Sequence, residues 1–336
     1  MAPSGSRAGG KDKYDDAKHL LDSIGEEVYK EKVKSGAETY DSYLKGNLNT
    51  ASGSGGERAY TTDPCRLVED YYNNRLKGNS ERYPCESLSG KDAKGEEVPR
   101  FSDTLGGQCT DHRIKGNDRN VTGGACAPLR RLHVCDKNMV KMEKIATSTT
   151  SDTLLAEVCY AAKHEGESLR GQHGQHKLDN NNSSSQLCTV LARSFADIGD
   201  IIRGKDLYLG YDQKEKDRRE NLEKNLKDIF GKIYNELTST SGRNGVKDHY
   251  QDTTDFYQLR EDWWYANRRQ VWKAITCKAD TGNAYFRNTC NGGKRTEGYC
   301  RCNGDQPNDD NPNTDPPTYF DYVPQYLRWF EEWAED

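Results

Sequence analysis

The sequence predicts an all-α fold that is held together by disulfide bonds. Two observations lead to this prediction: apolar residues recur at helical spacing in several long segments, and 11 cysteines are spread along the chain. The 336 residues are enough for about two domains. Only 33% of them are hydrophobic, and the mean hydropathy is −1.06. Long polar loops and small cross-linked units are therefore expected in place of one large apolar core.

The first 58 residues are predicted to form a separate N-terminal segment. Within "YDDAKHLLDSIGEEVYKEKV", four apolar residues recur at helical spacing: Leu20, Leu21, Ile24 and Val28. The stretch "NTASGSGGER" (49–58) is typical of a flexible linker. Because a short amphipathic helix is not stable alone, we expect this helix to dock onto the chain that follows.

Residues 59–136 show little periodicity. Gly, Pro, Asn and Asp recur, and five cysteines lie in this region: Cys65, Cys85, Cys109, Cys126 and Cys135. The region is predicted to be irregular and held by disulfides.

Helical periodicity is strong from residue 150 onwards. The segment "SDTLLAEVCYAAK" (151–163) begins with a Ser/Asp cap and places Leu155, Val158 and Ala162 on one face. The polar stretch 166–186 is predicted to be a disordered loop. The segments 187–202 and 213–237 follow, with apolar stripes made of Leu187, Leu191, Phe195, Ile198 and Ile202, and of Leu222, Leu226, Ile229, Phe230, Ile233 and Leu237. Together these segments indicate a helical bundle.

The segment "DWWYANRRQVWKAITC" (262–277) holds three of the 5 tryptophans beside basic residues. It is either the core-facing stripe of a helix or an exposed aromatic and basic surface. Trp264, Val271 and Ile275 share one stripe, with Trp272 at its margin, which favours the core. Arg268 falls within the stripe and is predicted to form a buried ion pair. Arg269 and Lys273 are predicted to point outward.

The last segment, 304–336, combines a Pro/Asn/Asp-rich linker with "QYLRWFEEWAED", which predicts an amphipathic helix whose aromatic face has no partner. The chain has no N-terminal apolar signal sequence and no apolar run of 18 residues.

The cysteine spacing favours a disulfide framework over a metal site. No CxxC pair occurs. The remaining six cysteines are Cys159, Cys188 and a late group made of Cys277, Cys290, Cys300 and Cys302. Because the number is odd, one thiol is either free or paired with a residue outside this chain.

No motif for catalysis, cofactor binding or metal binding is present. His164, His173 and His176 fall in or beside the predicted loop. The cluster Cys126, His133 and Cys135 allows a thiol nucleophile, but disulfides are the favoured interpretation. The sequence therefore predicts no catalytic site, no metal and no cofactor. A net charge of −5 argues against a nucleic-acid partner.

Four blocks carry a family resemblance: "CAPLRRLHVCDKN" (126–138), "ARSFADIGDIIRGKDLYLG" (192–210), the tryptophan-rich segment 262–277 and "PTYFDYVPQYLRWFEEWAED" (317–336). In this order they resemble the Duffy-binding-like domain. More narrowly, the whole chain is similar to the N-terminal segment plus alpha-type domain that heads the variant erythrocyte membrane proteins of the malaria parasite Plasmodium falciparum. The pattern "KHLLD" (18–22) also resembles the export-type pattern of that family.

This resemblance implies a domain plan. An N-terminal segment (1–58) precedes an irregular first subdomain (59–136), a helical-bundle second subdomain (137–303) and the start of a third (304–336). Further cysteines of the third subdomain would account for the odd number.

The implied function is adhesion to host cells from the outer face of the infected erythrocyte, with the membrane anchor elsewhere in the parent protein. The implied ligands are erythrocyte glycans, namely heparan sulfate or heparin and ABO blood-group sugars, and the outcome is rosetting. One alternative is a protein receptor of endothelial or complement type bound by the same fold. A remote alternative is a secreted thiol enzyme.

Binding a sulfated glycan requires clustered Lys and Arg side chains on an exposed face. The candidates are Lys30, Lys32, Lys34, Lys214, Lys216, Arg218, Arg219, Lys224, Lys227, Arg269 and Lys273. For each cluster the competing interpretation is a solvated helix face balanced by nearby acids. A neutral sugar requires an aromatic face, for which Tyr208 and Tyr211 are the candidates, although the same residues suit a packed corner.

Overall fold

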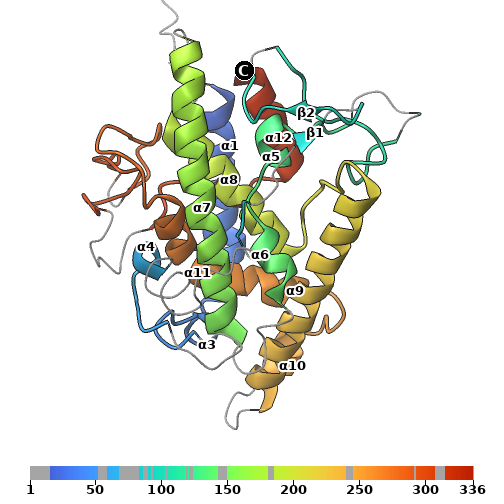
Figure 1. Ribbon diagram of the computed structural model, residues 1–336. Helices are drawn as coiled ribbons and strands as arrows, with labels where there is room; N and C mark the ends of the chain where they lie inside the picture. The colour runs from blue at the N-terminus through green and yellow to red at the C-terminus, as the bar shows by residue number, and fades with distance from the viewer. Residues whose placement is uncertain are drawn as a thin grey trace, which may run out of the picture.

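The computed structural model describes residues 16–335 except 52–58, 68–82, 86–89, 92–93, 103, 119, 121–123, 143–149, 181–184, 240–244, 291–292 and 307–314. Four long helices form the bundle: α7 (Thr150–Asp179), α8 (Leu187–Arg203), α9 (Gln213–Ser239) and α11 (Tyr257–Ile275). The steep helix α7 stands in front of α8, and α9 flanks them on the right (Figure 1). Helix α11 packs against both α7 and α8. The predicted helical architecture is confirmed.

The apolar stripes predicted for 187–202 and 213–237 face the core. All five stripe residues of α8 and all six of α9 are buried. Helix α8 lies deeper than its stripe suggests, because every one of its residues is buried.

The prediction for residues 166–186 was wrong over most of its length, because α7 continues to Asp179. Buried residues repeat at helical spacing beyond Ala162, namely Glu165, Gly166, Leu169 and His173. A Cβ on Gly166 would lie 1.9 Å from the carbonyl oxygen of Ile275. This half of α7 therefore packs through a close backbone approach and polar groups, which a search for apolar periodicity does not detect.

The tryptophans of α11 are core residues, as predicted. Trp263 and Trp264 are fully buried, and Trp272 is 1% exposed. The Arg268 guanidinium donates to both carboxylate oxygens of Asp321 at 2.7 Å. The predicted buried ion pair is confirmed.

The N-terminal segment docks onto the bundle, and the predicted stripe is only partly used: Leu21 and Val28 pack against the core. It contains α1 (Ala17–Val28), the π-helical turn η1 (Tyr29–Val33), α2 (Lys34–Ala37) and α3 (Asp41–Leu44). Leu20 and Ile24 of the predicted stripe remain 38% and 41% exposed. The buried residues of α1 are Asp22 and Gly25. A Cβ on Gly25 would lie 2.3 Å from the Tyr319 carbonyl oxygen, so glycine permits the close approach of helix and loop.

The region predicted to be irregular, residues 59–136, has no long helix among its described residues, and the short helix α6 (Lys137–Val140) follows it. Its described elements are single turns and a two-residue antiparallel pair in which Gly90 faces Val98 and Lys91 faces Glu97. The bounds are α4 (Pro64–Leu67), β1 (Gly90–Lys91), β2 (Glu97–Val98), α5 (Leu129–Leu132) and α6 (Lys137–Val140).

Ten of the 11 cysteines form disulfides, and the framework prediction is confirmed. The pairs are Cys65–Cys277, Cys85–Cys135, Cys109–Cys126, Cys188–Cys300 and Cys290–Cys302. Cys159 is free and fully buried in α7, and burial raises the pKa of its thiol. The odd cysteine is therefore an interior side chain with no access to a partner outside the chain.

The C-terminal segment packs on the bundle. After α10 (Val246–His249), the 3-10 turn η5 (Phe320–Tyr322) packs on α8, and α12 (Gln325–Glu335) packs on α8 and α1. The expectation of an unpartnered aromatic face holds only in part. Trp329 is fully buried, whereas Phe330 is 74% exposed.

None of the helices in the described part of the chain combines the length and apolar character that a membrane crossing needs.

Candidate functional site

A cleft of about 770 Å³ runs along α9, and several of the predicted basic candidates line it. We call it the α9 cleft. One wall is α9, with Lys216, Lys224 and Lys227. The other wall is a pair of loops joined by backbone hydrogen bonds, from Lys115 N to Leu207 O at 2.8 Å and from Leu209 N to Arg113 O at 2.7 Å. The site thus joins segments that are distant in the sequence.

The α9 cleft carries a net positive charge. No ion pair with another described residue is formed by Lys115, Lys216 or Lys224, whereas Lys227 pairs with Asp255 at 2.5 Å. Two lining carboxylates are neutralised, since Asp206 pairs with Arg131 and Arg219, and Glu223 with Arg260. Glu220 is the remaining acid of the lining. Three ammonium groups without an acidic partner among the described residues therefore outnumber the one lining carboxylate that is not neutralised, that of Glu220.

Lys115 and Tyr257 line the same cleft but were not predicted from the sequence. Lys115 is exposed, and Tyr257 is 45% exposed at the start of α11. Neither residue lies next to any of the predicted binding residues in the sequence. Only the tertiary fold brings them to α9, so no local sequence signal identifies them.

Arg218 and Arg219 are not free surface cations, which corrects that part of the prediction. Arg218 donates to Asp136 at 2.6 Å and to Glu215. Although burial alone would lower it, these carboxylates raise the pKa of Arg218 above its usual value. Arg219 pairs with Glu215 at 3.0 Å and with Asp206 at 3.2 Å. Both guanidinium groups are held by these carboxylates, and Arg219 also lines the α9 cleft.

Tyr208 offers no open aromatic face, so its prediction as a sugar platform was wrong. It is 2% exposed, and the guanidinium carbons of Arg219 and Arg131 lie 4.5 and 5.3 Å from its ring centre. Burial raises its pKa to about 12. Tyr211 is half-buried with the Lys91 ammonium 5.3 Å from its ring centre. Tyr208 instead forms the packed corner that was the competing interpretation.

The two outward positions predicted on α11 differ. Arg269 is exposed and pairs with Asp315 at 2.6 Å. Lys273 is buried, which corrects the prediction. The chain after α11 covers it, since Arg301 donates to the Lys273 carbonyl oxygen at 2.6 Å and Cys277 is tied to Cys65.

The N-terminal lysines are exposed but lie apart from the α9 cleft lining. Lys30 pairs with Glu26 at 2.6 Å, and Lys34 lies 3.7 Å from Glu38. Lys214 is exposed at the start of α9, beside the cleft but outside its lining.

The thiol cluster that was considered from the sequence contains no thiol. Cys126 and Cys135 are in disulfides. His133 is buried, with Nδ1 2.8 Å from the Leu129 carbonyl oxygen. His164, His173 and His176 are spaced along α7. Among the described residues there is no group of three or more side chains suited to hold a metal ion.

Two family models match the chain. The model of the Duffy binding domain matches residues 124–328, and the model of the N-terminal segments of PfEMP1 matches residues 16–52. The "Duffy receptor beta form" of Plasmodium knowlesi is 25% identical over 240 residues, which cover 68% of this chain and 16% of that protein. The "Duffy receptor" of Plasmodium vivax is 24% identical, covering 65% and 16%. The chain thus spans about a sixth of these curated relatives.

Solved structures agree with the models. The NTS-DBL1(alpha-1) domain of Plasmodium falciparum PfEMP1 from the varO strain superposes with a TM-score of 0.67 at 34% identity, covering 95% of this chain and 61% of that one. A DBLb domain of PfEMP1 solved in complex with human ICAM-1 gives a TM-score of 0.63 at 25% identity, covering 98% and 63%.

Proposed function

The chain belongs to the Duffy binding domain family, and from this we propose that it is a host-cell adhesion domain that binds sulfated glycans of the erythrocyte surface through the α9 cleft. The observation that carries the proposal is the set of three ammonium groups without acidic partners, Lys115, Lys216 and Lys224, around one cleft. The parent protein would display the domain outside the infected erythrocyte, where glycan binding to uninfected cells produces rosettes.

A sulfated chain suits this cleft for two physical reasons. Ammonium groups attract sulfates without demanding one fixed geometry, so a heterogeneous polymer can be accommodated. The cleft is also continuous along α9 from Lys216 to Lys227, close to three helical turns. Successive acidic groups of a polymer can therefore bind along it. Because exposed charges are screened, the affinity should fall as salt rises.

Two further ligands remain as alternatives. A protein receptor is supported by relatives, since one structural neighbour was solved bound to human ICAM-1 and curated relatives are named Duffy receptors. For a neutral ABO blood-group sugar, the half-open ring of Tyr257 is the aromatic face that the α9 cleft offers.

The test is elution from a heparin column for two double variants that remove the same charge. Lys216→Gln with Lys224→Gln should lower the affinity for heparin about tenfold, because each ion pair at the protein surface contributes up to about 1 kcal/mol. Lys32→Gln with Lys34→Gln is the matched control on the exposed N-terminal segment. Binding of the unchanged chain to red cells should fall after heparinase treatment of the cells.

The alternatives give distinct results. Loss of retention only in the N-terminal variant would place the glycan on that segment and contradict the assignment to the α9 cleft. No retention of the unchanged chain would contradict sulfated-glycan binding and leave a protein receptor or a neutral sugar.

A further inference from the structure

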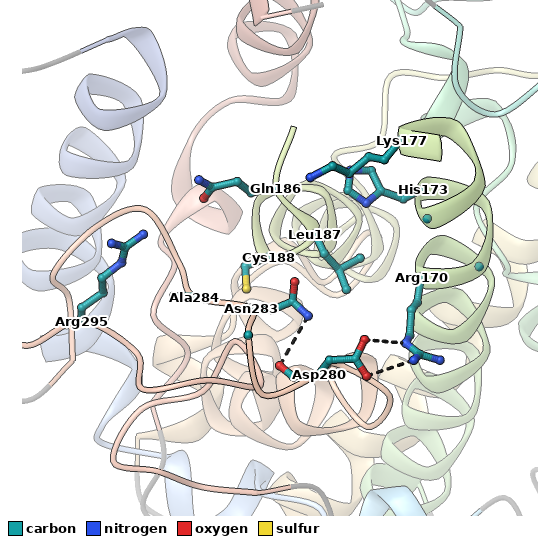
Figure 2. A pocket seen from close by; sticks show the side chains of 13 residues that line it. Arg170, His173, Lys177, Gln186, Leu187, Cys188, Asp280, Asn283, Ala284 and Arg295 are labelled. Carbon is teal, nitrogen blue, oxygen red and sulfur yellow. Dashed lines mark hydrogen bonds and ion pairs between the residues drawn. The ribbon is translucent and has the colours of Figure 1, made fainter. Parts of the chain in front are cut away.

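A second cleft, of about 490 Å³, lies at the other side of the bundle, and Figure 2 shows it from close by. We call it the α7–α8 cleft. It lies between the C-terminal half of α7, the first turn of α8 and the loop that follows α11. In Figure 1 this loop lies to the left of α7, whereas α9 lies to its right. None of the residues that line the α9 cleft lines this one.

The α7–α8 cleft is basic because its one acid is already neutralised. Arg170 donates to both carboxylate oxygens of Asp280, at 3.0 and 3.1 Å. The other two cations, Lys177 and Arg295, are exposed and form no ion pair with any described residue. Burial lowers the pKa of His173 to about 4, so this ring is neutral at pH 7. The cleft therefore carries a net charge of about +2 at pH 7.

The two uncompensated cations come from opposite walls. Figure 2 shows Lys177 on α7 and Arg295 on the facing loop. The Arg295 Nε donates to the Tyr285 carbonyl oxygen at 3.0 Å, which anchors the side chain while its two terminal nitrogens remain to bind a ligand. Helix α8 begins in this cleft, and its dipole adds to the positive potential. The Gln186 side chain does not cap the helix.

The rest of the lining is polar and open. Leu187 and Ala284 are its main apolar contributions. The Asn283 amide nitrogen lies 3.4 Å from the Asp280 carbonyl oxygen, and Figure 2 shows its carboxamide oxygen turned into the cleft. A Cβ added at Gly171 or Gly174 would meet nothing within 4 Å. The volume lies in the usual range for small-molecule sites, about 300–1,000 Å³.

We propose that the α7–α8 cleft is a second binding site, which takes a single acidic sugar unit. The oxyanion of the sugar lies between Lys177 and Arg295, and its hydroxyls donate to Asn283 and exchange hydrogen bonds with Gln186. Because the lining is mostly polar and charged, an acidic polar ligand suits the cleft better than a hydrophobic one. The amides beside the cations can bind hydroxyl groups, which distinguishes a sugar from a bare inorganic anion. The inference does not depend on the α9 cleft, which lies on other elements.

The experiment is a titration of the isotope-labelled full chain with glucuronate at constant ionic strength, followed by amide shifts of Leu187, Cys188 and Ala284. We expect saturable shifts with glucuronate and none with glucose. Lys177→Gln or Arg295→Gln should weaken binding five- to tenfold. Lys278→Gln removes the same charge from an exposed lysine near the cleft but outside its lining, and should leave the affinity unchanged.

A variant that fills the cleft without changing its charge tests the contribution of shape. Gly174→Leu places a bulky side chain at an open position on α7 and should block glucuronate while the fold persists. Three results would overturn the proposal: equal weakening by Lys278→Gln, unchanged binding in Gly174→Leu, or equal binding of inorganic sulfate at the same ionic strength. The double variant of the α9 cleft should bind glucuronate as the unchanged chain does.

Discussion

At the scale of single residues, charge is placed inside the bundle and compensated there. The Asp197 carboxylate accepts from Arg130 at 2.8 Å and from Arg328 at 2.8 Å. These three residues lie on α8, α5 and α12, so one carboxylate joins three elements. Removing one partner of such a buried group leaves an uncompensated charge, which is strongly destabilising.

The first prediction concerns the stability of the fold at acidic pH. Although burial alone would raise it, Arg130 and Arg328 hold the pKa of Asp197 at about 2, below its ordinary value of 3.8. Because the folded-state pKa is depressed, this contribution of about 2 kcal/mol is present above pH 4 and is lost as the pH falls toward 2. Carbon-13 titration of the aspartate carboxyls measures it directly. Asp200, whose pKa is raised by burial, should protonate first, and a midpoint for Asp197 near 4 would contradict the assignment.

Sequence reasoning found one of these interior charges and missed others. Arg268 was predictable because it interrupts an apolar stripe, and its ion pair with Asp321 is confirmed. Asp197 and Asp200 carry no such signal, because on α8 they resemble the polar face of an amphipathic helix. Their burial depends on Arg130 and Arg328, which come from segments more than 60 residues away. Interior arginines also explain how a chain with few hydrophobic residues forms a core.

At the scale of elements, the packing of α7 on α11 depends on one glycine. Gly166→Ala would place a Cβ 1.9 Å from the Ile275 carbonyl oxygen, so the helices must separate. We expect a loss of about 2 kcal/mol in the free energy of unfolding, the usual cost of overpacking. Gly171→Ala on the same helix meets open space and should gain about 0.5–1 kcal/mol. Urea denaturation of both variants decides this, and equal effects would show that α7 does not contact α11 so closely.

Elements were predictable where apolar side chains carry the helical period. Helices α8 and α9 have such stripes, and their ends were located within a few residues. The second half of α7 was mistaken for a loop because Gly166 and His173 occupy its buried positions. Only one wall of the α9 cleft could be predicted from the sequence. Its lysines on α9 form a visible cluster, but the loop that brings Lys115 beside them is specified by tertiary pairing.

At the scale of the whole molecule, long-range links hold the irregular region and the N-terminal segment to the bundle. The Cys65–Cys277 disulfide closes a loop of 212 residues, and the sequence alone could not assign its connectivity. The N-terminal segment has no disulfide of its own. Its later part is attached by Tyr40, Leu44 and Leu48, which are buried in the main core. Its first helix, α1, is attached through Asp22, whose buried carboxylate accepts from Arg287 at 2.5 Å and from the Tyr319 backbone N–H at 2.7 Å. Docking by a buried charge explains why the apolar residues Leu20 and Ile24 face outward.

The attachment of α1 should therefore depend on one carboxylate. In Asp22→Asn the Arg287 guanidinium loses a buried partner and, among the described carboxylates, keeps Glu26 at 2.7 Å, so we expect a loss on the order of 3 kcal/mol in the free energy of unfolding. Because the bundle has its own core and disulfides, the loss should appear as local opening: amide exchange protection should fall in α1 while α8 and α11 stay protected. Glu27→Gln, an exposed change on the same helix, is the control. Loss of protection throughout the bundle would show instead that the segment and the bundle unfold as one unit.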